Sequence, residues 1–272
     1  MAVPAAYALG RDPDESARLR RQSEELRPET VALLDRIGLA PGQAAIDLGC
    51  GPSGILDLLV AAVSPGGRVV GLDVDPRHTA LAAHHARQLG LAGVEIVTAN
   101  ARATGLPTAS FDLVHARTLL APISNPAGVV AEMARLARPG GWVASQEPDC
   151  EYSLCYPPKP AWDRLHEIFL AGFGRSGADP LIGRRVAELF RQVGLDDLTA
   201  VSYAPLYPPG HSRRTVLPDL VRSLRPMILK LGLADERELD EVDDEVRQHL
   251  ADPRTLVIPH LMMAVWARKP GG

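Results

Sequence analysis

Ala45-Ile46-Asp47-Leu48-Gly49-Cys50-Gly51-Pro52-Ser53-Gly54 decides the fold of this 272-residue chain. A short apolar run passes through glycines into residues with helical spacing, which is typical of a strand, a turn and a helix. Gly49 and Gly51 lack a Cβ, so the backbone there can approach a ligand very closely. Open α/β sheets bind ligands at the carboxyl ends of their strands. The stretch therefore predicts a nucleotide or nucleoside cradle.

Outward from this stretch, β-rich runs alternate with helical patterns between residues 40 and 148, which favours a parallel sheet with helices on both faces. Further strands are expected beyond residue 195, after a stretch rich in proline and aromatic residues. The predicted strands span residues 44–48, 68–72, 94–99, 111–116, 142–146, 198–203 and about 257–267.

The composition sets limits on location and partners. The formal net charge is −4 and basic residues occur only in short pairs, so a nucleic-acid partner is not expected. No run of about 18 apolar residues appears, and we expect a cytoplasmic protein without a membrane span. The three cysteines show neither a disulfide framework nor zinc-ligand spacing, so no metal site is predicted.

Two kinds of ligand fit the glycine motif. Gly49, Gly51 and Gly54 spell the GxGxxG dinucleotide fingerprint, and Asp73 at the end of the second strand could bind ribose hydroxyls in either case. Asp47, however, could receive a cationic amino group and would sit poorly beside a pyrophosphate. Together with Pro52 it favours a ligand that has an amino-acid end and a sulfonium but no phosphate.

Residues 40–148 resemble class I S-adenosylmethionine-dependent methyltransferases of the ubiquinone-biosynthesis-like group. The sequence departs from the family pattern at Ser53, where a third glycine is usual, and at Asn100, where aspartate is more common. An asparagine oxygen can accept the same hydrogen bond as aspartate. The motifs that carry the resemblance, in order, are 47–51, 70–73, Asn100-Ala101, 111–114 and 136–141.

The resemblance implies a Rossmann-like, doubly wound, seven-stranded and mostly parallel sheet with an antiparallel last strand and helical cap insertions. We expect residues 1–39 to form an N-terminal helical cap segment and residues 40–272 the methyltransferase domain. The expected cap insertions span about 149–178 and 208–256.

The same resemblance implies that S-adenosylmethionine is the cofactor. Arg117 would point into the crevice at the strand ends, with a surface ion pair as the alternative, and Tyr7 could close over the methionine carboxylate. The residues expected to contact the cofactor are Tyr7, Asp47, Gly49, Gly51, Asp73, Asn100, Ala101 and Arg117.

Methyl transfer from a sulfonium is an in-line displacement that chiefly requires alignment and exclusion of water. Glu147, His211 and His260 are the candidate catalytic groups, while a core position bonded to a neighbour is expected for His115. Tyr152, Tyr156 and Trp162, followed by Phe169 and Phe173, could line a substrate pocket or pack the cap onto the sheet.

The predicted reaction moves a methyl group to an oxygen, nitrogen or carbon of a small, apolar or aromatic metabolite, in an enzyme that could be a homodimer. Two other functions stay open from the sequence. One is an NAD-dependent dehydrogenase that uses the GxGxxG motif literally, and the other is a cofactor-binding protein of this fold without methyl transfer.

Overall fold

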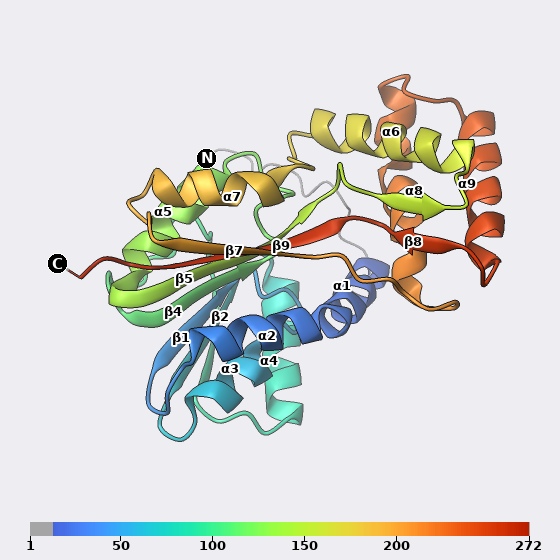
Figure 1. The fold of residues 1–272 in the computed structure, drawn as a ribbon. Coiled ribbons are helices and arrows are strands. Elements are labelled where there is room, and N and C mark those ends of the chain that lie inside the picture. Colours follow the sequence, from blue (N-terminus) through green and yellow to red (C-terminus); the bar gives the residue numbers. More distant parts are fainter. Residues whose placement is uncertain (1–12, 272) are drawn as a thin grey trace.

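A seven-stranded sheet forms the centre of the computed structural model, which describes residues 13–271 (Figure 1). The strand order is β3-β2-β1-β4-β5-β9-β7, and only β9 runs antiparallel to its neighbours. The predicted mostly parallel sheet with an antiparallel last strand is confirmed. The bounds are β1 (Ala44–Leu48), β2 (Arg68–Asp73), β3 (Val94–Thr98), β4 (Phe111–Arg117), β5 (Ala137–Asp149), β7 (Leu198–Tyr203) and β9 (Leu261–Arg268).

Two strands differ from the expectation. β5 is longer than the predicted 142–146, because its start continues directly from a helix and its end pairs with β9. The single last strand expected over about 257–267 is two strands, β8 (Leu256–Ile258) and β9. β8 leaves the main sheet and pairs with β6 (Leu154–Tyr156) in a separate two-stranded sheet. Pro259, which cannot donate to a ladder, lies between them.

Helices cover both faces of the sheet, as Figure 1 shows. One face carries α2 (Arg27–Ile37), α3 (Leu56–Val63) and α4 (Pro76–Gln88), and the other carries α5 (Pro126–Leu136) and α7 (Ile182–Arg191). Each face of the sheet has its own apolar core. One core includes residues of α2 and α3, and the other includes residues of α5 and continues into the C-terminal helices. Asp75 and Asn125 cap their helices by accepting from Arg77 N and Gly128 N.

A cap follows β5 and lies beside the carboxyl ends of the strands (Figure 1). The last of its helices buries Leu239, Val246 and Leu250 on one face. The cap helices share one continuous core with the sheet. The elements are α6 (Pro160–Arg175), the short 3₁₀ helix η1 (Ser212–Thr215), α8 (Val216–Lys230), α9 (Glu236–Ala251) and the β6–β8 pair.

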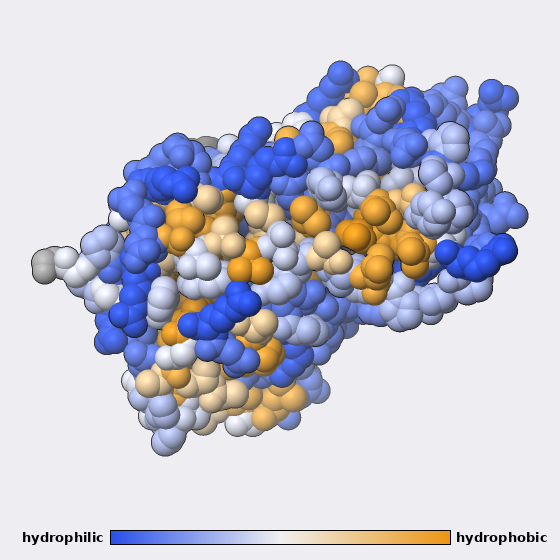
Figure 2. Space-filling model, in the orientation of Figure 1, coloured by the Kyte–Doolittle hydropathy of each residue, from blue (hydrophilic) through white to orange (hydrophobic). Residues whose placement is uncertain are grey.

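The surface is mixed in character. Figure 2 shows hydrophilic side chains over the outer helices and an apolar patch near β8. Leu154 and Leu256 on the two-stranded sheet are among the exposed large hydrophobic residues. Over residues 13–271, none of the helices combines the length and the apolarity needed to cross a membrane.

Candidate functional site

The glycine loop after β1 is built on left-handed backbone. Gly49 and Gly51 have φ values of +71° and +57°, which glycine adopts without steric cost. The N–H groups of Gly49 and Cys50 both donate to Leu72 O, at 2.7 and 2.9 Å, and this fixes the loop on β2. A Cβ built on Gly51 meets nothing within 4 Å, so a side chain there would occupy open space over the loop. The loop therefore forms a cradle that glycine keeps open.

Asp73 stands at the lip of this cradle, at the end of β2. Its Oδ2 accepts from Gly51 N and its Oδ1 accepts from Asp75 N, both at 2.9 Å. The carboxylate also raises the pKa of His78, whose Nδ1 lies 3.7 Å from Oδ1. The side chain is 13% exposed, so Asp73 is held in one orientation with an accessible edge. This is the geometry that hydroxyl recognition needs.

Asn100 and Ala101 follow β3, next to the end of β2. The N–H of Ala99 donates to Asp73 O at 3.0 Å, which places the two strand ends side by side. Asn100 is exposed, and its Oδ1 accepts from Arg102 N at 2.9 Å. An amide oxygen has two lone pairs, so this turn leaves one for a ligand.

Asp47 makes contacts inside the protein. It is 3% exposed, its Oδ1 lies 2.8 Å from Nδ1 of the fully buried His115, and its Oδ2 accepts from Ile55 N at 3.1 Å. The prediction that His115 is a core histidine bonded to a neighbour is confirmed. Asp47 still lines the cradle, but its carboxylate chiefly ties β1, β4 and the start of α3 together.

Arg117 lies at the end of β4 and lines the cradle from the other side. Its guanidinium donates to Thr30 Oγ1 at 2.9 Å and to Ser23 Oγ at 2.6 Å. Burial lowers the pKa of the Arg117 guanidinium, although the nearby Asp47 carboxylate acts in the opposite direction. The alternative of a surface ion pair is wrong, because the side chain is enclosed by α1 (Pro13–Glu25) and α2.

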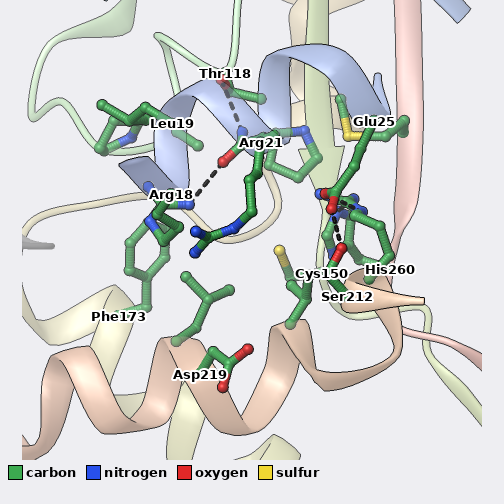
Figure 3. A pocket seen from close by; sticks show the side chains of 18 of the residues that line it. Arg18, Leu19, Arg21, Glu25, Thr118, Cys150, Phe173, Ser212, Asp219 and His260 are labelled. Carbon is green, nitrogen blue, oxygen red and sulfur yellow. Dashed lines mark hydrogen bonds and ion pairs between the residues drawn. The ribbon is translucent and has the colours of Figure 1, made fainter. Parts of the chain in front are cut away.

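Two cavities meet behind α1. The cradle encloses about 50 Å³ and a second cavity encloses about 140 Å³. Leu19, Gln22 and Thr118 line both and form the wall between them. Gln22 accepts from Arg18 Nη1 at 2.7 Å and donates to Thr118 Oγ1 at 3.2 Å, so a chain of hydrogen bonds runs along this wall (Figure 3).

Thr118 in that wall has a φ of +52°. A threonine in left-handed backbone is strained, and such residues gather at functional sites. Its Oγ1 donates to Arg117 O at 2.8 Å, which helps to hold the conformation. The strained residue lies where the two cavities adjoin.

The second cavity is mixed in character (Figure 3). Apolar side chains come from the loop after β4, from α6 and from α8, while α1 and η1 supply charged groups. The lining residues outside the shared wall are Arg18, Arg21, Glu25, Ala121, Pro122, Pro148, Cys150, Phe169, Phe173, Ser212, Arg213, Val216, Asp219, Leu220, His260 and Met262.

Glu147 lines neither cavity. It is fully buried and accepts hydrogen bonds from the backbone N–H groups of Leu119, Leu120 and Ala121, at 3.0, 2.9 and 3.3 Å. Burial raises its pKa to about 8, although these bonds act in the opposite direction. In this position Glu147 anchors the loop after β4.

The two candidate histidines lie in different places. His260 lines the second cavity, and its Nε2 lies 2.9 Å from Arg213 Nη2. Burial and the neighbouring Arg213 hold its pKa well below the usual value, so the ring is neutral. His211 caps η1 by accepting from Arg213 N and stacks on Tyr207, with ring centroids 4.6 Å apart. His211 is not among the residues that line either cavity.

Three of the five residues that could line a substrate pocket lie outside the second cavity. Tyr152 and Tyr156 are 63% and 60% exposed near the β6–β8 sheet, and Trp162 is buried in the core with its Nε1 donating to Ser153 Oγ. β6 pairs with β8 in a separate two-stranded sheet, which holds Tyr156 outside the second cavity. Phe169 and Phe173, one helical turn apart on α6, do line the cavity.

Some cavity residues gave no signal in the sequence. Arg21, Glu25, Arg213 and Asp219 come from helices whose charged positions resemble any solvated face, and only the packing of α1 against η1 and α8 brings them together. Tyr7 lies outside the described residues. Within the part of the chain that the structure describes, no group of three or more His, Cys, Asp or Glu side chains could hold a metal ion.

Comparison with known proteins finds similarity to methyltransferases. Residues 39–169 match the model of a methyltransferase domain. The chain is 34% identical over 125 residues to nocamycin O-methyltransferase of Saccharothrix syringae, which covers 46% of this chain and 45% of that protein. It is 29% identical over 248 residues to trans-aconitate 2-methyltransferase of Methylobacterium radiotolerans, which covers 88% of this chain and 86% of that protein.

The fold has solved counterparts. Phosphoethanolamine N-methyltransferase 2 of Haemonchus contortus, in complex with S-adenosyl-L-methionine, matches with a TM-score of 0.58 and 16% identity over 90% of this chain and 53% of its own. At that identity the match concerns the fold. The chain spans about half the length of several curated relatives that it matches.

Proposed function

We propose that this chain, whose residues 39–169 match a methyltransferase domain, uses S-adenosylmethionine to methylate a small organic molecule. The observation that carries the proposal is the wall that the glycine cradle shares with the second cavity, through Leu19, Gln22 and Thr118. A methyl donor and an acceptor that occupied the two cavities would meet beside these three residues, where the cavities adjoin. Proximity of this kind supplies a large part of the rate of a displacement.

The cradle fits the proposed cofactor. The open space over Gly51 leaves room for a ligand, and Asp73 is oriented to accept from hydroxyl groups. Asn100 and Ala101 would contact the adenine, and Arg117 would face the methionine carboxylate. When bound, S-adenosylmethionine supplies a methyl group on a sulfonium. The acceptor forms a bond to the methyl carbon while the carbon–sulfur bond breaks and its electron pair stays on sulfur.

The second cavity supports an acceptor of modest size with an apolar part. Phe169 and Phe173 offer aromatic surface, and Ala121 and Met262 extend it. The names of the relatives, nocamycin O-methyltransferase and trans-aconitate 2-methyltransferase, refer to small organic acceptors and support this class. Oxygen, nitrogen and carbon acceptors all remain within the proposal.

The dehydrogenase alternative fits the fold less well. The dinucleotide-binding sheet has parallel strands in the order 3-2-1-4-5-6. Here the antiparallel β9 lies between β5 and β7. This departure argues against a hydride-transfer enzyme of that family.

The proposal is tested by incubating the protein with S-adenosylmethionine that carries a labelled methyl group and with a fractionated small-molecule extract. Label in a low-molecular-weight product, with S-adenosylhomocysteine formed in equal amount, supports it. Label recovered only in protein or nucleic acid contradicts the acceptor class. Binding of S-adenosylhomocysteine without consumption of the donor under any fraction would indicate a cofactor-binding protein that transfers no methyl group.

A further inference from the structure

A guanidinium group is buried at the second cavity. Arg213 on η1 is 4% exposed and lines the cavity. Its Nη2 lies 2.9 Å from His260 Nε2, and its Nε has no hydrogen-bond partner among the residues that the structure describes. Since burying a cation is costly unless it is paired, this arrangement needs negative charge nearby.

The neighbouring groups supply little of that charge. The closest carboxylate is Glu25, whose Oε2 lies 4.0 Å from Arg213 Nε, and its Oε1 already accepts from Ser212 Oγ (Figure 3). His260 is neutral, so its Nε2 accepts a hydrogen bond from Arg213 but the ring adds no negative charge. The Tyr207 ring also faces the guanidinium, 5.8 Å from its carbon, but a ring carries no net negative charge, so the charge of Arg213 is incompletely balanced by the described residues.

Asp219, the other acid of the cavity, is engaged elsewhere. Its Oδ1 accepts from Arg247 Nη2 at 2.9 Å and its Oδ2 accepts from Thr215 Oγ1 at 2.9 Å. It is thus part of a contact between α8 and α9 and does not neutralise the cavity. A carboxylate that pairs with Arg213 would have to come from the ligand.

A second cation lies at the mouth of the same cavity. Arg21 on α1 is exposed and projects toward the space between Phe173 and Cys150 (Figure 3). Unlike Arg213, it has no ion pair with another described residue. Arg21 and Arg213 thus place positive charge at the opening and in the interior, around an apolar lining.

We propose that the methyl acceptor is an amphipathic acid whose carboxylate is bound by Arg213 and Arg21. This inference rests on the proposed function. The apolar body of the acid lies against Phe169 and Phe173. The planar guanidinium is the side chain best suited to a carboxylate, and a hydrogen bond with two ionised partners is stronger than a neutral one. This class is narrower than the apolar or aromatic acceptor that the sequence alone suggested, because it adds a carboxylate.

Calorimetric titration tests this assignment in the full chain saturated with S-adenosylhomocysteine. The probes are phenylacetate, 3-phenylpropionate and 4-phenylbutyrate, each compared with its primary amide. We expect at least one acid to bind about tenfold or more tightly than its amide. Arg213→Gln should abolish this preference and Arg21→Gln should reduce it several-fold.

Arg20→Gln is the matched control, because Arg20 is exposed on the same helix and does not line the cavity. It should leave the preference for acids unchanged. If no acid of the series binds more tightly than its amide, or if Arg21→Gln and a folded Arg213→Gln both keep the preference, the inference is overturned. Failure of S-adenosylhomocysteine to bind in the same titration would instead overturn the proposed function.

Discussion

The backbone N–H of Gly51 donates a hydrogen bond of 2.9 Å to Oδ2 of Asp73. The glycine loop after β1 and the acid at the end of β2 are therefore one unit, joined across neighbouring parallel strands. A ligand that contacts one of them meets the other in a fixed place. This relationship explains why the two motifs occur together in the sequence.

Asp73→Asn should weaken the binding of S-adenosylhomocysteine by about tenfold or more. Asp73 accepts from Gly51 N and from Asp75 N through different oxygens. An amide has only one oxygen, so its NH₂ group would face one of those two N–H donors and could not accept from it. Isothermal titration calorimetry measures the change. Glu95→Gln, an exposed position on β3, is the control and should bind as the wild type does. Unchanged affinity in Asp73→Asn would remove Asp73 from the site.

Gly51→Ala and Gly105→Ala form a second matched pair. Both glycines have left-handed φ values, +57° and +74°, and neither has a neighbour within 4 Å of a built Cβ. Each substitution should destabilise the fold by roughly 1–2 kcal/mol, seen as a similar fall in Tm. Only Gly51→Ala should also weaken S-adenosylhomocysteine binding, because its methyl group enters the cradle. Equal affinities in the two variants would show that Gly51 does not border the ligand.

Arg117→Gln should cost both stability and cofactor affinity. The substitution removes the bonds to Thr30 and Ser23, which are worth roughly 1.5–3 kcal/mol when one partner is charged. Denaturant unfolding measures the stability change, and a titration with S-adenosylhomocysteine measures the affinity. Arg27→Gln, which loses an exposed ion pair with Asp57, should change stability by about 1 kcal/mol or less. A loss of stability without any loss of affinity would make Arg117 a purely structural residue.

Glu147→Gln should change how stability depends on pH. The pKa of Glu147 is raised to about 8 in the folded protein, above the unfolded value near 4.3, so the folded state holds the proton more strongly. Stability from this group is therefore complete below about pH 4 and is lost as the pH rises toward 8. The glutamine variant should lose less stability over that range, as thermal unfolding from pH 5 to 8 would show.

The same variant separates a loop anchor from a catalytic base. If Glu147 only holds Leu119, Leu120 and Ala121, Glu147→Gln should retain most of its methyl transfer at pH 6.5. A loss of more than about a hundredfold in kcat with an unchanged KM and Tm would restore the catalytic role that the sequence suggested.

The cofactor half of the site could be predicted from the sequence, because local rules determine it. Gly51 requires left-handed backbone, and Asp73 ends a strand that the hydrophobic pattern identifies. The position of His115 followed from the same strand register. These features depend on neighbours in the chain and on the parallel arrangement of the sheet.

The acceptor half could not be predicted in the same way. Tyr156 belongs to β6 and Tyr152 lies just before it, and β6 pairs with β8, a partner about a hundred residues away in the chain. Arg213 and Glu25 meet only because η1 packs against α1, and neither segment has a pattern that reveals this contact. Trp162 follows the packing rule for large aromatic side chains, which the sequence left as the alternative.

We propose that the cradle between β1 and β2 binds the nucleoside of S-adenosylmethionine. Calorimetric titration of the wild-type protein tests this binding directly. The protein would be titrated with S-adenosylhomocysteine and, separately, with NADH. We predict saturable, one-to-one binding of the thioether and none of the dinucleotide. Binding of NADH alone would contradict S-adenosylmethionine as the cofactor and would make the GxGxxG motif a dinucleotide fingerprint.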